Sequence, residues 1–322
     1  MNALEAAVRV AERHGLSVEE PVLLRSTNNV VAWLRPSMIV AKIGVGQRRG
    51  FHMELSVASE LAALDAPIVP PAPEFPAVVH RQDGFAVSFW RYHPQPADAD
   101  IPGTHVAAAL QRLHAVNAKL STALRAELPS YLEELQSVSE LLRDGKRLSA
   151  LPEVDRRLLI RTFDHLLTQA RLTSRADAHV VIHGSPHPYN VLLVDGTPRF
   201  IDFETTSIGP IEWDFAHTSP DAVHGYTGPM DTQLLETCRD LVRVKTAAWC
   251  WANVHRGDLR HHAELHLAHL KEKFTGAGGR RDGAQRPSSF RPALAGPREH
   301  STRGQKSSRT CACKPRRVRP DS

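Results

Sequence analysis

The sequence predicts an α+β protein of two lobes, in which a small strand-rich lobe precedes a larger helical lobe. Short apolar runs separated by polar turns fill residues 22–91, whereas apolar residues at helical spacing dominate from Thr104 onward. A chain of 322 residues is long enough for two moderate domains. We therefore expect an N-terminal lobe over residues 1–92, a helical lobe over 93–275, and a tail over 276–322.

The first elements of the N-terminal lobe follow from its apolar pattern. Residues 1–16 alternate charged and apolar side chains at helical spacing, which predicts an amphipathic helix. Residues 22–34 predict two strands around the polar turn at 26–29. Residues 38–43 predict a third strand, and Lys42 lies inside this apolar run.

A helix and two further strands complete this lobe. Residues 51–64 place apolar side chains at helical spacing, and the proline cluster over 67–76 ends that helix. Strands are expected at 77–80 and 85–91, the second being apolar and aromatic. The change of pattern after Trp90 predicts a hinge between the lobes.

The second lobe should be mainly helical, with short strands embedded in it. The clearest helical periodicity lies at residues 106–120, 151–172 and 231–274. Short strands are predicted at residues 179–183, 190–194 and 199–203.

The positive charge of the chain belongs to the tail. The whole chain has a formal net charge of +5. Residues 276–322 hold twelve Lys or Arg against three Asp or Glu, a net of +9, so the remainder carries −4. The tail lacks apolar periodicity and is therefore expected to be disordered. It could bind acidic surfaces weakly, but no specific nucleic-acid binding is expected.

Composition also predicts the compartment. No apolar run approaches the ~20 residues that span a bilayer, and the charged N-terminus lacks the apolar core of a signal peptide. Four scattered cysteines are too few for a disulfide framework. These features predict a cytoplasmic protein without membrane contacts.

A hairpin late in the chain gathers oxygen ligands. Asp195-Gly196 is a strong turn signal between two apolar strands. Pairing Val194 with Thr197 or Pro198 places Asn190 opposite Ile201 or Asp202. Either register brings Asn190 and Asp202 to the open end of the hairpin. An amide oxygen and a carboxylate suit Mg²⁺, whose coordination shell is completed by water and phosphate.

The spacing around this hairpin has a family resemblance. His183-x-Ser185-x4-Asn190, followed twelve residues later by Asp202 within Ile-Asp-Phe, resembles the catalytic and metal loops of the aminoglycoside phosphotransferase and choline kinase-like superfamily. Those loops contain His-Gly-Asp-x4-Asn and Ile-Asp-Phe, and they are related to the protein-kinase signature. The resemblance implies a protein-kinase-like fold, ATP and Mg²⁺ as cofactors, and a small-molecule hydroxyl as substrate. It assigns the metal to Asn190 and Asp202, and gives Asp214 the task of holding the loop.

The resemblance also implies a nucleotide site in the N-terminal lobe. Lys42 should contact the α- and β-phosphates, and a carboxylate on the following helix should pair with it. Glu54 fits the family position, although periodicity alone also allows Glu60. The turn that contains Ser26 and Asn28 should cover the phosphates.

The hinge should receive the adenine. The resemblance places the base against residues 88–92, around Trp90, where backbone groups would hydrogen-bond to it.

The chain departs from the family pattern at its catalytic aspartate, where it has Ser185. A serine hydroxyl is a poor proton acceptor at neutral pH, and general-base assistance contributes on the order of 10²–10⁴-fold. His187 is a possible replacement base, since an unperturbed imidazole has a pKa near ~6.5; the alternative is an exposed loop residue. Two functions therefore compete: a small-molecule kinase with an altered base, and a nucleotide-binding pseudoenzyme with little or no transfer activity.

The acceptor cannot be identified from the sequence. Acidic residues in the acceptor pocket would favour a cationic substrate. The candidates near the relevant stretch are Glu204, Glu212, Asp221 and Asp231.

Overall fold

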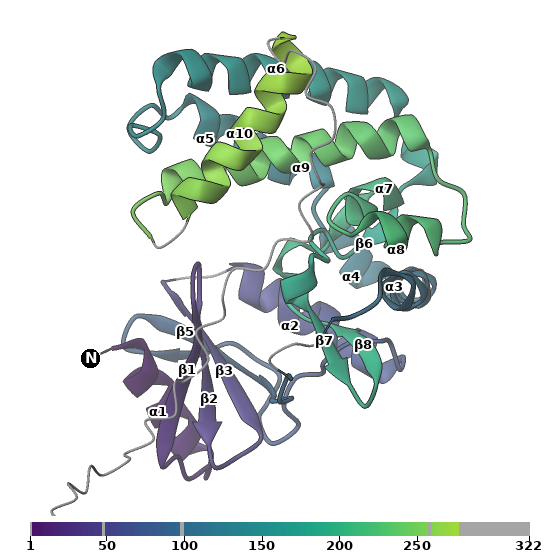
Figure 1. Ribbon diagram of the computed structural model, residues 1–322. Coiled ribbons are helices and arrows are strands. Elements are labelled where there is room, and N and C mark those ends of the chain that lie inside the picture. The colour runs from purple at the N-terminus through teal and green to yellow at the C-terminus, as the bar shows by residue number, and fades with distance from the viewer. Residues whose placement is uncertain (1, 47–48, 97–99, 257–258, 277–322) are drawn as a thin grey trace, which may run out of the picture.

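The two-lobed α+β architecture is confirmed in a computed structural model, which describes residues 2–46, 49–96, 100–256 and 259–276 (Figure 1). A twisted sheet with one helix beside it forms the N-terminal part, and a set of long helices forms the opposite end of the molecule. The predicted basic tail, apart from Gly276, lies outside the described residues. No described helix is both long and apolar enough to cross a membrane.

The N-terminal part contains one antiparallel sheet with the strand order β1-β2-β3-β5-β4. Its elements are α1 (Ala3–Arg13), β1 (Glu20–Ser26), β2 (Val30–Arg35), β3 (Ile39–Val45), α2 (Arg49–Ala63), β4 (His80–Gln82) and β5 (Phe85–Arg91).

One strand differs from its predicted place. The expected strand at 77–80 is displaced, and β4 begins at His80. Asp83 and Gly84 form a two-residue turn with positive φ angles of 51° and 81°, and Gln82 pairs directly with Phe85. In a two-residue turn the flanking residues pair with each other. The pairing of β4 with β5 therefore begins at Gln82 and Phe85 and extends back to His80.

One face of the sheet is covered by α1. Asn2 and Glu5 cap this helix reciprocally, each side chain accepting a hydrogen bond from the other residue's backbone N–H. The buried side of α1 packs on alternate residues of the central strands, including Ala32, Ala41 and Phe89. Because side chains alternate along a strand, the residues between them face the rest of the molecule. Lys42 is one of these residues.

The helical part contains the remaining elements. They are α3 (Gly103–Asn117), α4 (Thr122–Glu127), α5 (Tyr131–Arg143), α6 (Glu153–Thr173), β6 (Val180–Ile182), β7 (Val191–Val194), β8 (Thr197–Phe200), β9 (Ser207–Gly209), α7 (Ile211–Phe215), α8 (Pro220–His224), α9 (Thr232–Ala252) and α10 (Leu259–Thr275). Three short 3₁₀ turns, at Ala176–Ala178, Pro188–Asn190 and Phe203–Thr205, lie between them.

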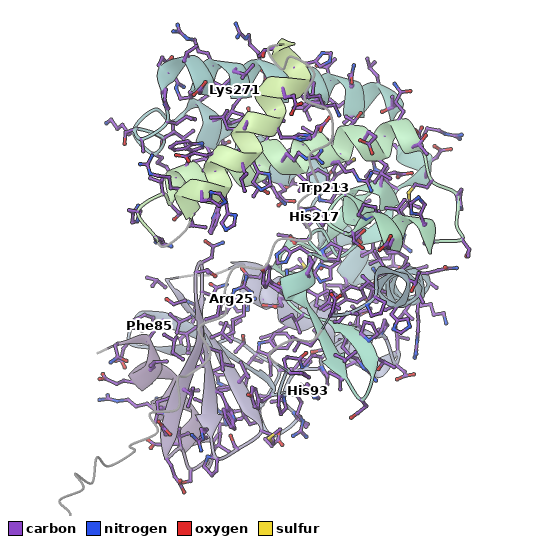
Figure 2. All side chains as sticks on the ribbon, viewed as in Figure 1. Arg25, Phe85, His93, Trp213, His217 and Lys271 are labelled. Atoms are coloured by element: carbon purple, nitrogen blue, oxygen red, sulfur yellow. The ribbon has the colours of Figure 1, made fainter. Side chains whose placement is uncertain are left out.

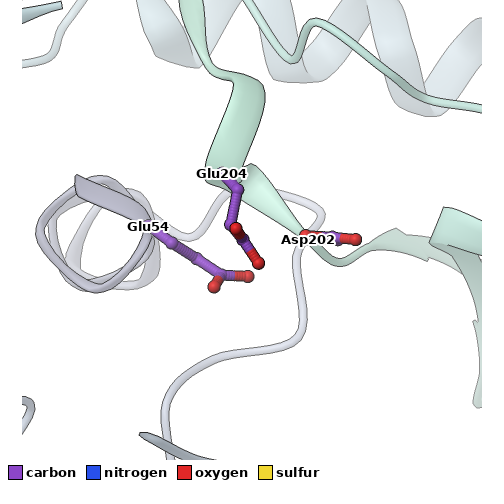
Figure 3. A group of neighbouring side chains, drawn as sticks. All are labelled: Glu54, Asp202 and Glu204. Atoms are coloured by element: carbon purple, nitrogen blue, oxygen red, sulfur yellow. The ribbon is translucent and has the colours of Figure 1, made fainter. Parts of the chain in front are cut away.

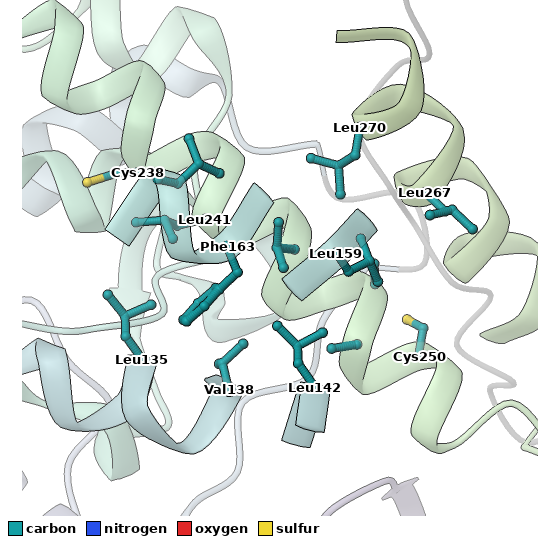
Figure 4. Close-up of a cluster of buried hydrophobic side chains, with 14 of the residues drawn as sticks. Leu135, Val138, Leu142, Leu159, Phe163, Cys238, Leu241, Cys250, Leu267 and Leu270 are labelled. Carbon is teal, nitrogen blue, oxygen red and sulfur yellow. The ribbon is translucent and has the colours of Figure 1, made fainter. Parts of the chain in front are cut away.

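Four helices at the far end share one apolar core. Leu135 of α5, Phe163 of α6, Leu241 of α9 and Leu270 of α10 are completely buried there (Figure 4). The same core includes the buried thiol of Cys238, and burial raises the pKa of this thiol. The sulfur is therefore a core atom and not a reactive thiolate.

A second core joins α2 to the β7–β8 hairpin. Val57 and Leu61 of α2 are completely buried in the same cluster as Phe200 of β8 and Leu110 of α3. No residue of β1, β2 or β3 belongs to this cluster. The helix that carries Glu54 is therefore packed on the helical part, while its carboxylate faces the sheet.

Candidate functional site

Lys42 stands at the centre of a group of three carboxylates (Figure 3 shows the three acids). Its Nζ donates to both oxygens of Glu54 at 2.9 and 2.8 Å. The same Nζ lies 2.7 Å from Asp202 Oδ1 and 2.6 Å from Glu204 Oε1. Glu60, the other possible partner, instead accepts hydrogen bonds from Ser121. The ammonium thus links β3, α2 and the segment after β8.

The charges in this group shift one another's pKa values. Burial raises the pKa of Glu54, although the ammonium of Lys42 acts in the opposite direction. Burial alone would lower the pKa of Lys42, but the three carboxylates raise it above its usual value. Burial would raise the pKa of Asp202, but Lys42 brings it below its usual range. Lys42 is therefore a permanent cation, and Asp202 is ionised near neutral pH.

Glu204 is a site residue whose position the sequence did not reveal. It was a candidate for the acceptor pocket, but its carboxylate contacts Lys42 and accepts a 2.6 Å hydrogen bond from Asn29 Nδ2. A Cβ on Gly50 would lie 3.1 Å from Glu204 Oε2, so glycine at that position leaves room for the carboxylate. The spacing Asp-x-Glu at 202–204 was the available signal.

The hairpin has the first of the two predicted registers. Val194 pairs with Thr197, and both turn residues, Asp195 and Gly196, have positive φ angles. The N–H of Ile201 donates to the carbonyl of Asn190 at 3.0 Å, so these two residues lie opposite each other at the open end. Asp202, with φ 69° and ψ 64°, follows directly in the left-handed region.

The donor set fits a hard divalent cation. Asn190 is 2% exposed; its Nδ2 donates to the carbonyl of Ser185, but its buried Oδ1 has no hydrogen-bond partner among the described residues. Such an oxygen needs a ligand, because an unpaired buried polar atom costs about 1–3 kcal/mol. Carboxylate oxygens of Glu54, Asp202 and Glu204 lie within 4.8 Å of one another. Mg²⁺ prefers oxygen ligands of these kinds.

Hydrogen bonds between backbone groups and buried side chains fix the conformation of the loop between β6 and the hairpin. Asp214 is completely buried and accepts hydrogen bonds from the backbone N–H groups of His183 (2.9 Å) and Gly184 (2.7 Å). Its Oδ2 also lies 2.8 Å from His114 Nε2. His183 Nε2 in turn lies 3.0 Å from the carbonyl of Ile201, which connects this loop to the hairpin. Asp214 thus has the contacts that hold the loop.

Ser185 and His187 lie on this loop, and His187 is not the exposed residue that one hypothesis required. The carbonyl of Ser185 accepts hydrogen bonds from the Asn190 side chain and from the N–H of His187. The Nδ1 of His187 is buried, and no residue in the described part of the chain hydrogen-bonds to it. Burial lowers the pKa of His187 to about 4, and the nearby Arg25 and Lys245 act in the same direction. At neutral pH the imidazole is uncharged.

The predicted phosphate-covering turn lies at the end of the sheet that faces the loop. Ser26 pairs with Val30, whose side chain packs with the α1 cluster, so the Ser26 side chain lies on the opposite face from Lys42. Asn28 is exposed at the tip. Asn29 is the turn side chain that reaches the carboxylate group.

The hinge follows β5. Trp90 lies on the same face of the sheet as Lys42, and its Nε1 donates to Ser88 Oγ at 2.9 Å. Gln95 then joins the hinge to β7: its Oε1 accepts from the N–H of Leu193 at 2.8 Å, and its Nε2 lies 3.2 Å from the carbonyl of the same residue. This clamp was not predicted, because a single glutamine after a strand gives no signal of its distant partner.

The other acidic residues considered for the acceptor have structural partners or lie elsewhere. Glu212 is buried and accepts the N–H of Asp231, whose carboxylate caps α9. Asp221 is exposed on α8.

A basic side chain instead lies beside the loop that carries Ser185. Lys245 donates to Glu134 at 2.8 Å and lies 3.2 Å from His217 Nε2, which burial keeps neutral by lowering its pKa well below the usual value. Figure 2 places His217 and Trp213 on the helical side and Arg25 at the facing end of the sheet.

A strand lysine paired with a helix glutamate, beside a hairpin that ends in oxygen ligands, is the arrangement of the protein-kinase-like fold. The family model described as "Phosphotransferase enzyme family" matches residues 40–249. The chain therefore belongs to this family, as the resemblance indicated. A sequence comparison with curated proteins finds no match.

Solved structures support the same fold. The AMP-bound spectinomycin phosphotransferase APH(9)-Ia has a TM-score of 0.62 at 14% identity, covering 84% of this chain and 95% of the other. The GDP and kanamycin complex of APH(2")-IIIa has a TM-score of 0.61 at 17% identity, covering 85% and 99%. Choline kinase from Cryptosporidium parvum has a TM-score of 0.58 at 13% identity, covering 84% and 95%. At these identities the likeness establishes the fold.

Proposed function

We propose that the protein is an ATP-dependent phosphotransferase that acts, with Mg²⁺, on the hydroxyl of a small molecule resembling an antibiotic, choline or a sugar. One observation carries the proposal. The Lys42 ammonium contacts three carboxylates where the sheet meets the hairpin, and Asn190, whose buried Oδ1 has no partner among the described residues, lies at the open end of that hairpin. Cations and oxygen ligands in this arrangement suit a metal-bound polyphosphate.

The chemistry follows from these positions. An acceptor oxygen forms a bond to the γ-phosphorus while the bond from that phosphorus to the bridging oxygen breaks, and the electron pair leaves on ADP. The acceptor proton passes to solvent, directly or through the uncharged His187. Asn190, Asp202 and Glu204 would hold Mg²⁺, which when bound neutralises phosphate charge. Lys42 would orient the α- and β-phosphates.

The comparisons support a nucleotide and a small acceptor. Similar folds are complexes with AMP or with GDP and kanamycin, and one is a choline kinase. ATP as the nucleotide and the cytoplasmic location remain predictions from the sequence.

The test is a thermal-shift titration with Mg-ATP, with Mg-GTP alongside. A ligand at 100 times its Kd should add about 2.7 kcal/mol of stability. Asp202→Asn should remove the magnesium-dependent part of the shift, and Lys42→Ala should weaken nucleotide binding with or without metal. Asp195→Asn, in the turn at the other end of the same hairpin, is the matched control and should leave the shift unchanged. A shift that survives both site substitutions would place the nucleotide elsewhere.

A nucleotide-binding pseudoenzyme is the second candidate, and Ser185 is the observation that favours it. The loop keeps the contacts that shape it but lacks the carboxylate at its centre. Binding of Mg-ATP without turnover above the Asp202→Asn background would support this candidate over the kinase.

A further inference from the structure

Arg25 lies in the same cross-strand row as Lys42. Arg25 on β1 pairs with Val31 on β2, Val31 pairs with Lys42 on β3, and Lys42 pairs with Ser88 on β5. Side chains of directly paired residues project from the same face of a sheet. Arg25 therefore points from the face that carries Lys42, two strands away, with backbones roughly 10 Å apart at the usual strand spacing.

A β-bulge gives Arg25 this direction. Leu23 pairs with Ala32 and Arg25 pairs with Val31, so Leu24 is an additional residue on β1. In a regular ladder Leu24 would lie opposite Val31, and Arg25 would face the α1 side. Because a shift of one residue reverses the face of a side chain, the bulge brings Arg25 to the Lys42 face.

The guanidinium group acts electrostatically on the loop that carries Ser185 but has no partner there among the described residues. Arg25 is half-buried and makes no hydrogen bond or ion pair with any described residue. Its charge nevertheless contributes to the lowered pKa values of His187, on the loop, and of Asp202, after the hairpin. Figure 2 shows Arg25 at the end of the sheet that faces the helical part. Lys42, by contrast, already contacts three carboxylates.

We propose that Arg25 is a phosphate-binding residue that contacts the terminal phosphate of the bound nucleoside triphosphate. This inference rests on the proposed function. An arginine in the Lys42 row, without a partner among the described residues, matches an anion at the point of transfer, and its planar fork suits phosphate oxygens. In phosphoryl transfer, catalysis depends mainly on positioning and charge neutralisation, so such a contact would offset part of what Ser185 lacks.

The test compares nucleotides that differ by one phosphate. Calorimetric titration would measure the Kd of the full chain for Mg-AMP-PNP, a non-hydrolysable triphosphate, and for Mg-ADP. Arg25→Gln should weaken Mg-AMP-PNP on the order of 10- to 100-fold, the range for charge-assisted hydrogen bonds. Mg-ADP should change less than about 3-fold, since its phosphates lie at Lys42. Arg25→Lys should recover part of the loss, because charge is kept but the fork is not.

Arg35→Gln is the matched control, because it removes the same charge from the same sheet at the far end of β2, where Arg35 pairs with Glu20. Both affinities should then stay as in the wild type. Equal weakening of the triphosphate and diphosphate by Arg25→Gln would mean a structural role and overturn the inference. Unchanged affinities would overturn it too. If the wild type bound neither nucleotide, the proposed function would fail first.

Discussion

Position 185 decides how far the family chemistry extends to this chain. The loop around it keeps its shape through Asp214, and its backbone carbonyl is held by Asn190 and His187. A carboxylate at this position would therefore be placed by the existing backbone. The side chain of Ser185, and not the loop, is the departure.

Ser185→Asp should raise phosphoryl transfer if the chain is a kinase that lacks its usual base. The gain should be on the order of 10²–10⁴-fold, the usual contribution of a general base. Release of ADP from Mg-ATP with water as acceptor provides the measurement before any acceptor is known. Ser185→Asn is the matched control, with similar size and no charge. Equal rates for the two variants would count against the missing-base hypothesis.

His187 should make stability depend on pH in a defined window. Its pKa is lowered in the fold to about 4, first by burial. In the unfolded chain it should be near ~6.5. The fold thus favours the neutral ring: the stabilising contribution is complete above pH ~6.5 and is lost as pH falls through about 4.

Urea unfolding at pH 7 and pH 4.5 would measure this effect. His187→Asn should lose less stability between the two pH values than the wild type, whereas His105→Asn, at an exposed position on α3, should behave like the wild type. An unchanged loss in His187→Asn would show that other groups cause the acid sensitivity.

Single residues were predicted best where spacing is short. Asn190 and Asp202 come together because one hairpin turn determines their distance, and the sequence contains that turn. The contacts of Glu204 with Asn29 and of Gln95 with Leu193 join residues 175 and 98 positions apart. No local pattern reports such pairs, because they depend on how the two lobes meet.

At the scale of elements, the turn after β6 depends on glycine for two separate reasons. Gly184 has φ +88°, a conformation that L side chains rarely adopt. A Cβ there would also lie 2.1 Å from the carbonyl oxygen of Thr205. Only glycine at position 184 therefore allows the loop after β6 and the segment after Asp202 to lie this close together.

Gly184→Ala should disturb the packing of the loop against Thr205. Gly196→Ala is the control that separates the effect of the positive φ angle from the effect of the close contact. Gly196 has φ +75° but nothing within 4 Å of its added Cβ, so it should cost only the backbone term, on the order of 1–2 kcal/mol. Gly184→Ala should cost about 1–3 kcal/mol more, the range for overpacking. It should also abolish the Mg-ATP thermal shift. Equal destabilisation of the two variants in urea unfolding would contradict the contact argument.

The other predicted strands and helices overlap observed ones, with ends that differ by a few residues, whereas α5 and β9 were not predicted. The displaced β4 shows why errors remain. Apolar residues at 77–79 resembled a strand, but the position of a three-residue strand is set by its turn and not by its own composition. The bulge in β1 was not predicted for a similar reason, because the sequence Leu23-Leu24-Arg25 contains no signal of an additional residue.

For the whole molecule, composition and motif order predicted the two lobes, and the family match confirms the class. What the sequence did not predict is how the cores are divided. Periodicity shows that α2 has an apolar face but not which lobe covers it. In the structure that face, through Val57 and Leu61, packs with Phe200 of the hairpin.

The core membership of α2 has a consequence for movement. A helix fixed to the helical lobe cannot follow the sheet when the lobes separate, so any opening must stretch the Lys42–Glu54 contact, now 2.8 Å. The Lys42–Glu54 distance would therefore report on the separation of the lobes. A pair of spectroscopic labels, one on β3 and one on α2, would follow opening and closing during turnover, whereas labels on α2 and β8 would stay at constant separation.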